Sequence, residues 1–307
     1  MNKRVAVLGA SGHTGTFVVA ELRRRGFTPI PCGRGTDLDA AFQDADAVIN
    51  CAGPFASTAA PAITAAIRAG IPYLDVTAEL EVVRDTFAGF ADAPIPIVPA
   101  AAFYGGLGDL LATAAASSWP SLDQIFIAYG LSSWHPTSGT RKTGQVSAQR
   151  RDGRRVMHTG GTLRFRDGDA PRGSWTFPAS FGTHDVIGEF TMADSVTIPT
   201  HLDVPEIDSC MTANAVADLH GSSITPSPGL SSQRFVVEVV ARSGTSERRA
   251  WAGGQDIYAI TAPLVVEATH RLLSGEGDKT GVATLGARFH PADFLDALSP
   301  THLTGSW

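Results

Sequence analysis

The chain has 307 residues, a length that fits two domains or one large one. Its 24 Lys and Arg residues against 30 Asp and Glu residues give a formal charge of −6, and this mildly acidic balance argues against nucleic acid or an anionic membrane surface as a partner. Hydrophobic residues make up 43% and charged residues 18%, which excludes a disordered chain, and no apolar run approaches the roughly 18–20 residues of a membrane span.

The first part of the chain alternates short apolar runs with helical patterns. Apolar, β-branched runs of this length are typical of strands buried on both faces of a parallel sheet. The expected strands are residues 4–8, 27–32, 47–50, 73–76 and 95–98, and the expected helices are residues 16–25, 38–44, 61–69, 80–90 and 110–117. This alternation predicts an α/β fold with a doubly wound parallel sheet over residues 1–119.

From Trp119-Pro120 onward, short strands are separated by loops rich in Gly, Pro and Ser. The expected strands are residues 124–131, 162–166, 195–198 and 234–241. They predict a mostly antiparallel sheet in an α+β substrate and dimerisation domain, residues 120–255. The amphipathic helix expected at 259–273 indicates that residues 256–307 return to complete the first domain.

Residues 141–172 carry nine Lys and Arg against three Asp and Glu. Such a segment is typical of a solvated loop or edge strand, or it lines a site for an anionic substrate or a cofactor phosphate. The sequence leaves both interpretations open.

A glycine loop, Gly9-x-x-Gly12-x-x-Gly15, stands between the first strand and the first helix. The first Gly permits a tight turn, the second lets backbone N–H groups approach a diphosphate, and the third lets the helix pack closely on the strand. The residues expected to bind a dinucleotide here are Gly9, Ser11, Gly12, His13, Thr14 and Gly15.

The end of the second strand bears on the choice of nucleotide. An acidic residue there would bind the ribose hydroxyls of NAD, but Arg34 stands at this point and suits the 2′-phosphate of NADP. Asp37 can reach the ribose if the loop folds back. We therefore expect NADP(H), with NAD(H) possible.

Three further motifs follow expected strands, where the ligands of open α/β sheets collect. The loop of Cys51, Ala52, Gly53, Pro54 and Phe55 is expected to pass close to the nicotinamide ribose. Asp75 and Glu79 bring two carboxylates to the cleft as candidate catalytic groups, although they equally suit capping of the helix at 80–90. Tyr104 is either a proton donor or a packing residue under the cofactor.

The sequence does not contain the residue patterns that two kinds of enzyme mechanism require. None of the four tyrosines is followed four positions later by a Lys, which argues against a short-chain dehydrogenase mechanism, and the histidines form no H-E-x-x-H or comparable pair, so we expect no metal site. The scattered cysteines Cys32, Cys51 and Cys210, with an N-terminal apolar run that breaks into a glycine loop instead of a signal peptide, fit a reduced, cytoplasmic protein.

The sequence resembles the saccharopine dehydrogenase-like family, including its saccharopine reductase and trans-acting enoyl reductase branches. The motifs at residues 7–15, 50–55 and 69–79 carry the resemblance, and those at 138–143 and 254–261 carry it less sharply. It implies an NAD(P)-binding Rossmann domain, a mixed-sheet substrate domain and often a homodimer. The chain departs from the family in a shortened segment between residues 34 and 46, in Ala78 where Gly is usual, and in Tyr104 where Asp or Ser is more common.

Together these features predict an NADPH-dependent oxidoreductase that reduces a C=N or activated C=C bond of a small, carboxylate-bearing metabolite. The candidate substrate-binding residues, all in Gly/Pro-rich loops, are His135, Arg141, Lys142, Trp175 and His184. Two alternatives remain open, a non-catalytic NADP(H)-binding sensor or scaffold and an oxidative dehydrogenase of an amino or hydroxy acid.

Overall fold

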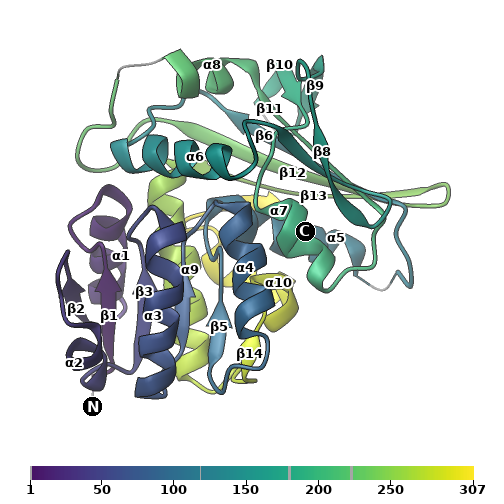
Figure 1. Cartoon of the computed structure of the whole chain (residues 1–307). Coiled ribbons are helices and arrows are strands. Elements are labelled where there is room, and N and C mark those ends of the chain that lie inside the picture. The colour runs from purple at the N-terminus through teal and green to yellow at the C-terminus, as the bar shows by residue number, and fades with distance from the viewer. Residues whose placement is uncertain (1, 118, 179–180, 222–223) are drawn as a thin grey trace.

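The structure is a computed structural model that describes residues 2–117, 119–178, 181–221 and 224–307. It contains two sheets, a parallel one with helices on both faces and a mixed one stacked beyond the carboxyl ends of the parallel strands (Figure 1). This arrangement confirms the fold class expected from the sequence.

The parallel sheet has six strands and an order that reverses in the manner of a doubly wound fold. Its strands, in spatial order, are β14 (Gly281–Val282), β5 (Pro96–Val98), β4 (Tyr73–Asp75), β3 (Ala47–Asn50), β1 (Arg4–Leu8) and β2 (Thr28–Cys32). The helices around it are α1 (His13–Arg24), α2 (Leu38–Gln43), α3 (Phe55–Ala69), α4 (Leu80–Phe90), α9 (Ile257–Leu273), α10 (Leu285–Arg288) and α11 (Pro291–Leu298). Each β1 side chain from Val5 to Leu8 is buried, because helices cover both faces.

Over the residues that the structure describes, the mixed sheet has nine strands, and only its β6–β11 pair is parallel. The main path runs β15 (Thr304–Ser306), β13 (Ser246–Gln255), β12 (Arg234–Ser243), β6 (Gln124–Leu131), β11 (Glu206–Thr212), β10 (Gly182–Gly188) and β9 (Arg172–Phe177), with β7 (Arg155–Thr159) paired to β11 and β8 (Thr162–Arg166) paired to β7. Its helices are α6 (Ser138–Arg150), α7 (Asp194–Thr197), the 3-10 turn η2 (Ile198–Thr200) and α8 (Ala213–Gly221).

One hydrophobic core joins the two sheets. It runs from Val5 and Leu22 in the nucleotide half to Ile127 and Phe235 in the mixed sheet, through α9, the kinked turn η1 (Phe103–Leu107) and α5 (Gly108–Ala116). The last segment contributes to both sheets, since β14 pairs with β5 and β15 pairs with β13.

Three expected elements differ in the structure. The run at 195–198 was expected to be a strand because it is β-branched, but it forms α7 and the start of η2, and Asp194 at its head accepts a buried hydrogen bond from Tyr129 (2.8 Å). The basic segment at 141–172, for which the sequence predicts a loop or edge strand or the lining of an anionic site, forms α6 in its first part and the strands β7 and β8 after it. Helix α3 begins at Phe55 rather than at residue 61, because a carboxylate from a distant loop binds its first N–H groups.

Candidate functional site

The glycine loop forms the tight turn that its spacing predicts. Gly9 has φ +71°, and a Cβ there would lie 2.9 Å from the Cys51 carbonyl oxygen. Gly12 donates its N–H to the Gly9 carbonyl (2.9 Å) and is the N-cap residue of α1. A Cβ on Gly15 would lie only 2.1 Å from the Gly9 oxygen, so α1 packs on the turn with no room for a side chain. These three glycines fit the cradle that a dinucleotide diphosphate requires.

A cavity of about 1690 Å³ opens at the carboxyl ends of β1 to β4. It runs past the glycine loop and the loops after β2 and β3, and on to α6 and the edge of the mixed sheet. The expected cofactor-binding residues that line it are Gly9, Ser11, Gly12, His13, Thr14, Arg34, Cys51, Ala52, Gly53, Pro54 and Phe55. Gly15 does not line it, since its place is the contact between α1 and β1.

The two candidates after β2 have different roles in the structure. Arg34 lines the cavity and is exposed. The Asp37 side chain instead caps α2, where it accepts the N–H groups of Asp39 (3.0 Å) and Ala40 (3.3 Å). Asp37 is not among the lining residues, so the loop presents a cation to the cavity.

The loop after β3 is fixed by Asn50, a fully buried side chain. Its amide oxygen accepts the N–H of Ala52 (2.9 Å), and its amide nitrogen donates to the hydroxyls of Thr58 (3.2 Å) and Tyr73 (3.1 Å). These hydrogen bonds fix the backbone of residues 51–53, which line the cavity.

Asp75 lies beneath the cavity rather than on its wall. Its carboxylate accepts the N–H groups of Thr77 (3.1 Å) and Ala100 (2.9 Å) and the hydroxyl of Tyr73 (3.1 Å). Burial raises the pKa of Asp75 to about 6, although these hydrogen bonds oppose the shift. The contacts join the ends of β4 and β5, which is a positioning role.

Glu79 lines the cavity but its carboxylate is already bound. It accepts the N–H of Phe55 (2.6 Å) and of Ala56 (3.1 Å), and so caps α3 rather than the helix that follows it in sequence. Burial raises the pKa of Glu79, while those two bonds and the nearby Thr143 hydroxyl of α6 lower it. Glu79 thus joins the loop after β4 to the start of α3, and its carboxylate lies close to α6.

Tyr104 lies on the cavity wall in η1, with its ring packed against Phe103, Tyr129 and Trp134. Its hydroxyl oxygen is buried and has no hydrogen-bond partner among the described residues. Burial raises the pKa of Tyr104 well above its ordinary value, so the phenol stays protonated.

The start of α6 is attached to the nucleotide half through Tyr258 of α9. The Tyr258 hydroxyl accepts the N–H of Thr137 (3.2 Å) and the indole N–H of Trp134 (3.1 Å), and lies 2.9 Å from the Thr140 hydroxyl. The ring of His13, the first residue of α1, packs edge-on against Tyr258 with centroids 5.0 Å apart. Tyr258 therefore connects the glycine loop to the start of α6.

The end of α6 is attached to α4. Ser147 donates to Glu81 (2.6 Å), and Arg151 forms an ion pair with the same carboxylate (3.0 Å). Helix α6, whose residues line the cavity, is consequently fixed at both ends. It lies between the two sheets (Figure 1).

The five candidate substrate-binding residues separate into two groups. Arg141 and Lys142 line the cavity, whereas His135, Trp175 and His184 do not. Trp175 stacks on Phe126 (4.6 Å between centroids) and, with His184, belongs to the face of the mixed sheet that points away from the nucleotide half. The structure therefore does not bring Trp175 and His184 to the cavity.

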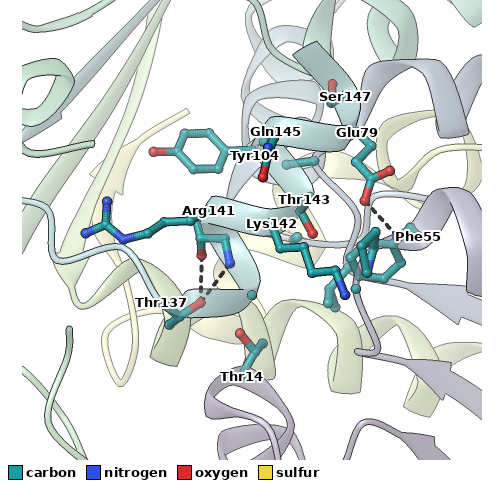
Figure 2. A pocket seen from close by; sticks show the side chains of 18 of the residues that line it. Thr14, Phe55, Glu79, Tyr104, Thr137, Arg141, Lys142, Thr143, Gln145 and Ser147 are labelled. Carbon is teal, nitrogen blue, oxygen red and sulfur yellow. Dashed lines mark hydrogen bonds between the residues drawn. The ribbon is translucent and has the colours of Figure 1, made fainter. Parts of the chain in front are cut away.

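Arg141 and Lys142 extend in opposite directions from α6 (Figure 2). Arg141 donates to the carbonyl of Leu219 in α8 (3.2 Å), on the mixed-sheet side. Lys142 extends toward Phe55, on the nucleotide side. The two cations do not form a single binding site.

Part of the remaining wall of the cavity is apolar, and we call this part the apolar wall. It consists of Trp134, Ile187, Phe190, Met192, Val216 and Leu219, while the polar Glu189, Thr191 and His220 line the cavity beside it. Sequence reasoning missed this wall, as it missed α6 and Tyr258, although Thr137 before a run without Pro is a helix-start signal that was present. Within the described ranges, no group of three or more His, Cys, Asp and Glu could hold a metal ion, and no described helix is long and apolar enough to cross a membrane.

The fold belongs to the class in which a Rossmann-type sheet is combined with a mixed-sheet second half. Saccharopine dehydrogenase (L-Glu forming) from Saccharomyces cerevisiae is similar over 99% of both chains, with a TM-score of 0.63 and 11% identity. An amine dehydrogenase from Mycobacterium smegmatis has a TM-score of 0.51 and 10% identity over 95% of this chain and 98% of its own. DAP dehydrogenase from C. glutamicum, in complex with DAP, has a TM-score of 0.50 and 13% identity over 97% and 98%.

These likenesses establish the fold over both halves of the molecule. No protein-family model matches the chain, and a search of curated proteins gives no match.

Proposed function

We propose that this protein is an NADP(H)-dependent oxidoreductase, similar to the saccharopine dehydrogenase-like enzymes, that reduces a C=N or activated C=C bond of a small carboxylate-bearing metabolite. The observation that carries the proposal is the cavity of about 1690 Å³, which joins a glycine loop to an apolar wall. Small-molecule pockets usually measure roughly 300–1,000 Å³, so this one has room for a dinucleotide and a second molecule. The three structures compared above are dehydrogenases by name, which supports a redox reaction.

The nucleotide half supplies binding groups for the cofactor. The N–H groups of His13 and Thr14, at the start of α1, suit the diphosphate. Arg34 suits a 2′-phosphate, and the competing carboxylate of Asp37 is engaged in capping α2. When bound, the nicotinamide supplies the hydride.

The opposite wall suits the substrate. Arg141, oriented by the Leu219 carbonyl, can bind a carboxylate beside the apolar wall. Tyr104, kept protonated by burial, is our candidate proton donor. Asp75 and Glu79 bind backbone N–H groups, so we assign them to positioning the loops rather than to proton transfer.

The test is oxidation of NADPH, followed by the absorbance of the reduced nicotinamide, against cyclic imines, 2-oxo acids with amines, and enones. Turnover of one class identifies the bond reduced. Binding of NADPH without turnover of any class would favour the sensor or scaffold alternative.

Cofactor preference is tested by R34D. Loss of one charge-assisted contact, and the repulsion that replaces it, should weaken NADP(H) relative to NAD(H) by roughly 1–3 kcal/mol in fluorescence titrations. An unchanged preference would refute the assignment of Arg34 to the 2′-phosphate.

A further inference from the structure

The glycine loop brings no cation to the diphosphate it would hold. Residues 9–16 contain neither Lys nor Arg, and burial lowers the pKa of His13, which keeps its ring neutral. Backbone N–H groups and the partial charge of a helix N-terminus compensate only part of the two negative charges of a diphosphate. A side-chain cation from elsewhere on the cavity wall would supply the remainder.

Most cations on the wall already have partners. Arg151 pairs with Glu81 (3.0 Å), Arg155 with Glu189 (2.8 Å) and Arg154 with Asp152 (3.2 Å). Arg34 follows β2, beside the place for the adenosine end of the cofactor. These cations are therefore either in ion pairs with carboxylates of the protein or lie away from the middle of the cavity.

Lys142 differs from them. Its ammonium has no ion pair or hydrogen bond within the part of the chain that the structure describes, and its side chain is exposed along the cavity. Figure 2 shows the Lys142 side chain extending from α6 toward Phe55 and away from Arg141. Thr14 lies below Lys142 in this view.

The neighbouring residue fixes this placement. A Cβ on Gly53 would lie 2.7 Å from the Thr143 hydroxyl, so α6 lies directly against the loop after β3 at this point. Thr143 also lowers the pKa of Glu79, the carboxylate that binds the start of α3, so the two side chains lie close together. The backbone that carries Lys142 is thereby attached to the nucleotide half.

From these observations we propose that Lys142, although it belongs to the second half of the chain, binds the cofactor and not the substrate, and that its ammonium pairs with the cofactor diphosphate. The proposal rests on the NADP(H) site proposed above and reassigns a residue that the sequence alone placed with the substrate. Since α6 is fixed to both halves, cofactor binding would also secure α6 over the occupied cavity.

The test uses two ligands and two variants of Lys142, with a third variant as the control. NADPH contains the diphosphate bridge, whereas adenosine 2′-monophosphate carries the adenosine and its 2′-phosphate with no phosphate at the 5′ position. K142M should raise the dissociation constant of NADPH about tenfold, the scale of one exposed charge-assisted contact, and leave that of adenosine 2′-monophosphate within about twofold. K142R should recover most of the affinity because it restores the charge.

R141M is the matched control, since it removes the adjacent cation of the same helix. It should leave NADPH affinity within about twofold of the wild type, which separates a direct contact from general damage to α6. The melting temperatures of K142M, K142R and R141M show whether each variant is folded.

The outcomes separate the two proposals. An unchanged NADPH affinity in K142M, or an equal loss for NADPH and adenosine 2′-monophosphate, would overturn the role of Lys142 while the cofactor site stands. Failure of the wild-type protein to bind either ligand would overturn the cofactor site and the role of Lys142 together.

Discussion

Gly15→Ala is the sharpest perturbation of the glycine loop. The added Cβ would lie 2.1 Å from the Gly9 carbonyl oxygen, 2.9 Å from its carbon and 3.0 Å from the Ala10 Cα. All three atoms are backbone, so no side chain can move aside, and the turn or α1 must shift by about 1 Å to restore ordinary contact.

The magnitude follows from that shift. Overpacking of this kind costs about 1–3 kcal/mol of folding stability. Displacing the Gly9 oxygen also weakens its hydrogen bond from Gly12, worth about 1 kcal/mol. Because this shift would displace the start of α1, whose N–H groups we assign to the diphosphate, we expect NADPH to bind at least about tenfold more weakly.

Gly89→Ala is the control, since it makes the same chemical change in α4 where a Cβ would meet nothing within 4 Å. It should leave NADPH binding unchanged and raise stability by up to about 1 kcal/mol. Urea unfolding and NADPH fluorescence titration measure both effects. Wild-type stability and affinity in G15A would refute the close packing of α1 on the first turn.

Three further substitutions test the buried groups around the site. Burial raises the pKa of Asp194 to about 6 from 3.8, so its carboxyl contributes stability that is present below its ordinary pKa and is lost as the pH rises through about 6. In urea unfolding between pH 4 and 7, D194N should reduce the change of the free energy of unfolding with pH by up to about 3 kcal/mol, while the part that Asp75 contributes remains. The same pH dependence in D194N and the wild type would contradict this prediction. E79Q should lower the free energy of unfolding by about 1–3 kcal/mol, because an amide cannot accept both N–H groups at the start of α3; unchanged stability would show that the cap is unimportant. Y104F should lower kcat by about 100-fold with NADPH affinity unchanged, and full activity would exclude Tyr104 as the proton donor.

The nucleotide half was predictable because its signals are local. Strand β1 is a continuous apolar run, and the three glycines mark a turn whose geometry depends on neighbouring residues. The lengths of the elements were less predictable, as the early start of α3 depends on Glu79, which is 24 residues further along the chain.

The second half was less predictable because its site depends on distant contacts. Helix α6 has a polar stripe rather than an apolar one, and Thr143 and Ser147 on that stripe meet Glu79 and Glu81 from another part of the chain. The direction in which a side chain points was also not predictable from the sequence. Whether Trp175 faces the cavity depends on strand register, and the divergence of Arg141 and Lys142 depends on where α6 lies.

The central claim, that this cavity holds a nicotinamide dinucleotide, is tested most directly by calorimetric titration of the purified protein with NADPH and with NADH. We predict saturable heat with one site per chain and tighter binding of NADPH. Absence of binding heat with both nucleotides, together with an unchanged melting temperature, would contradict the claim.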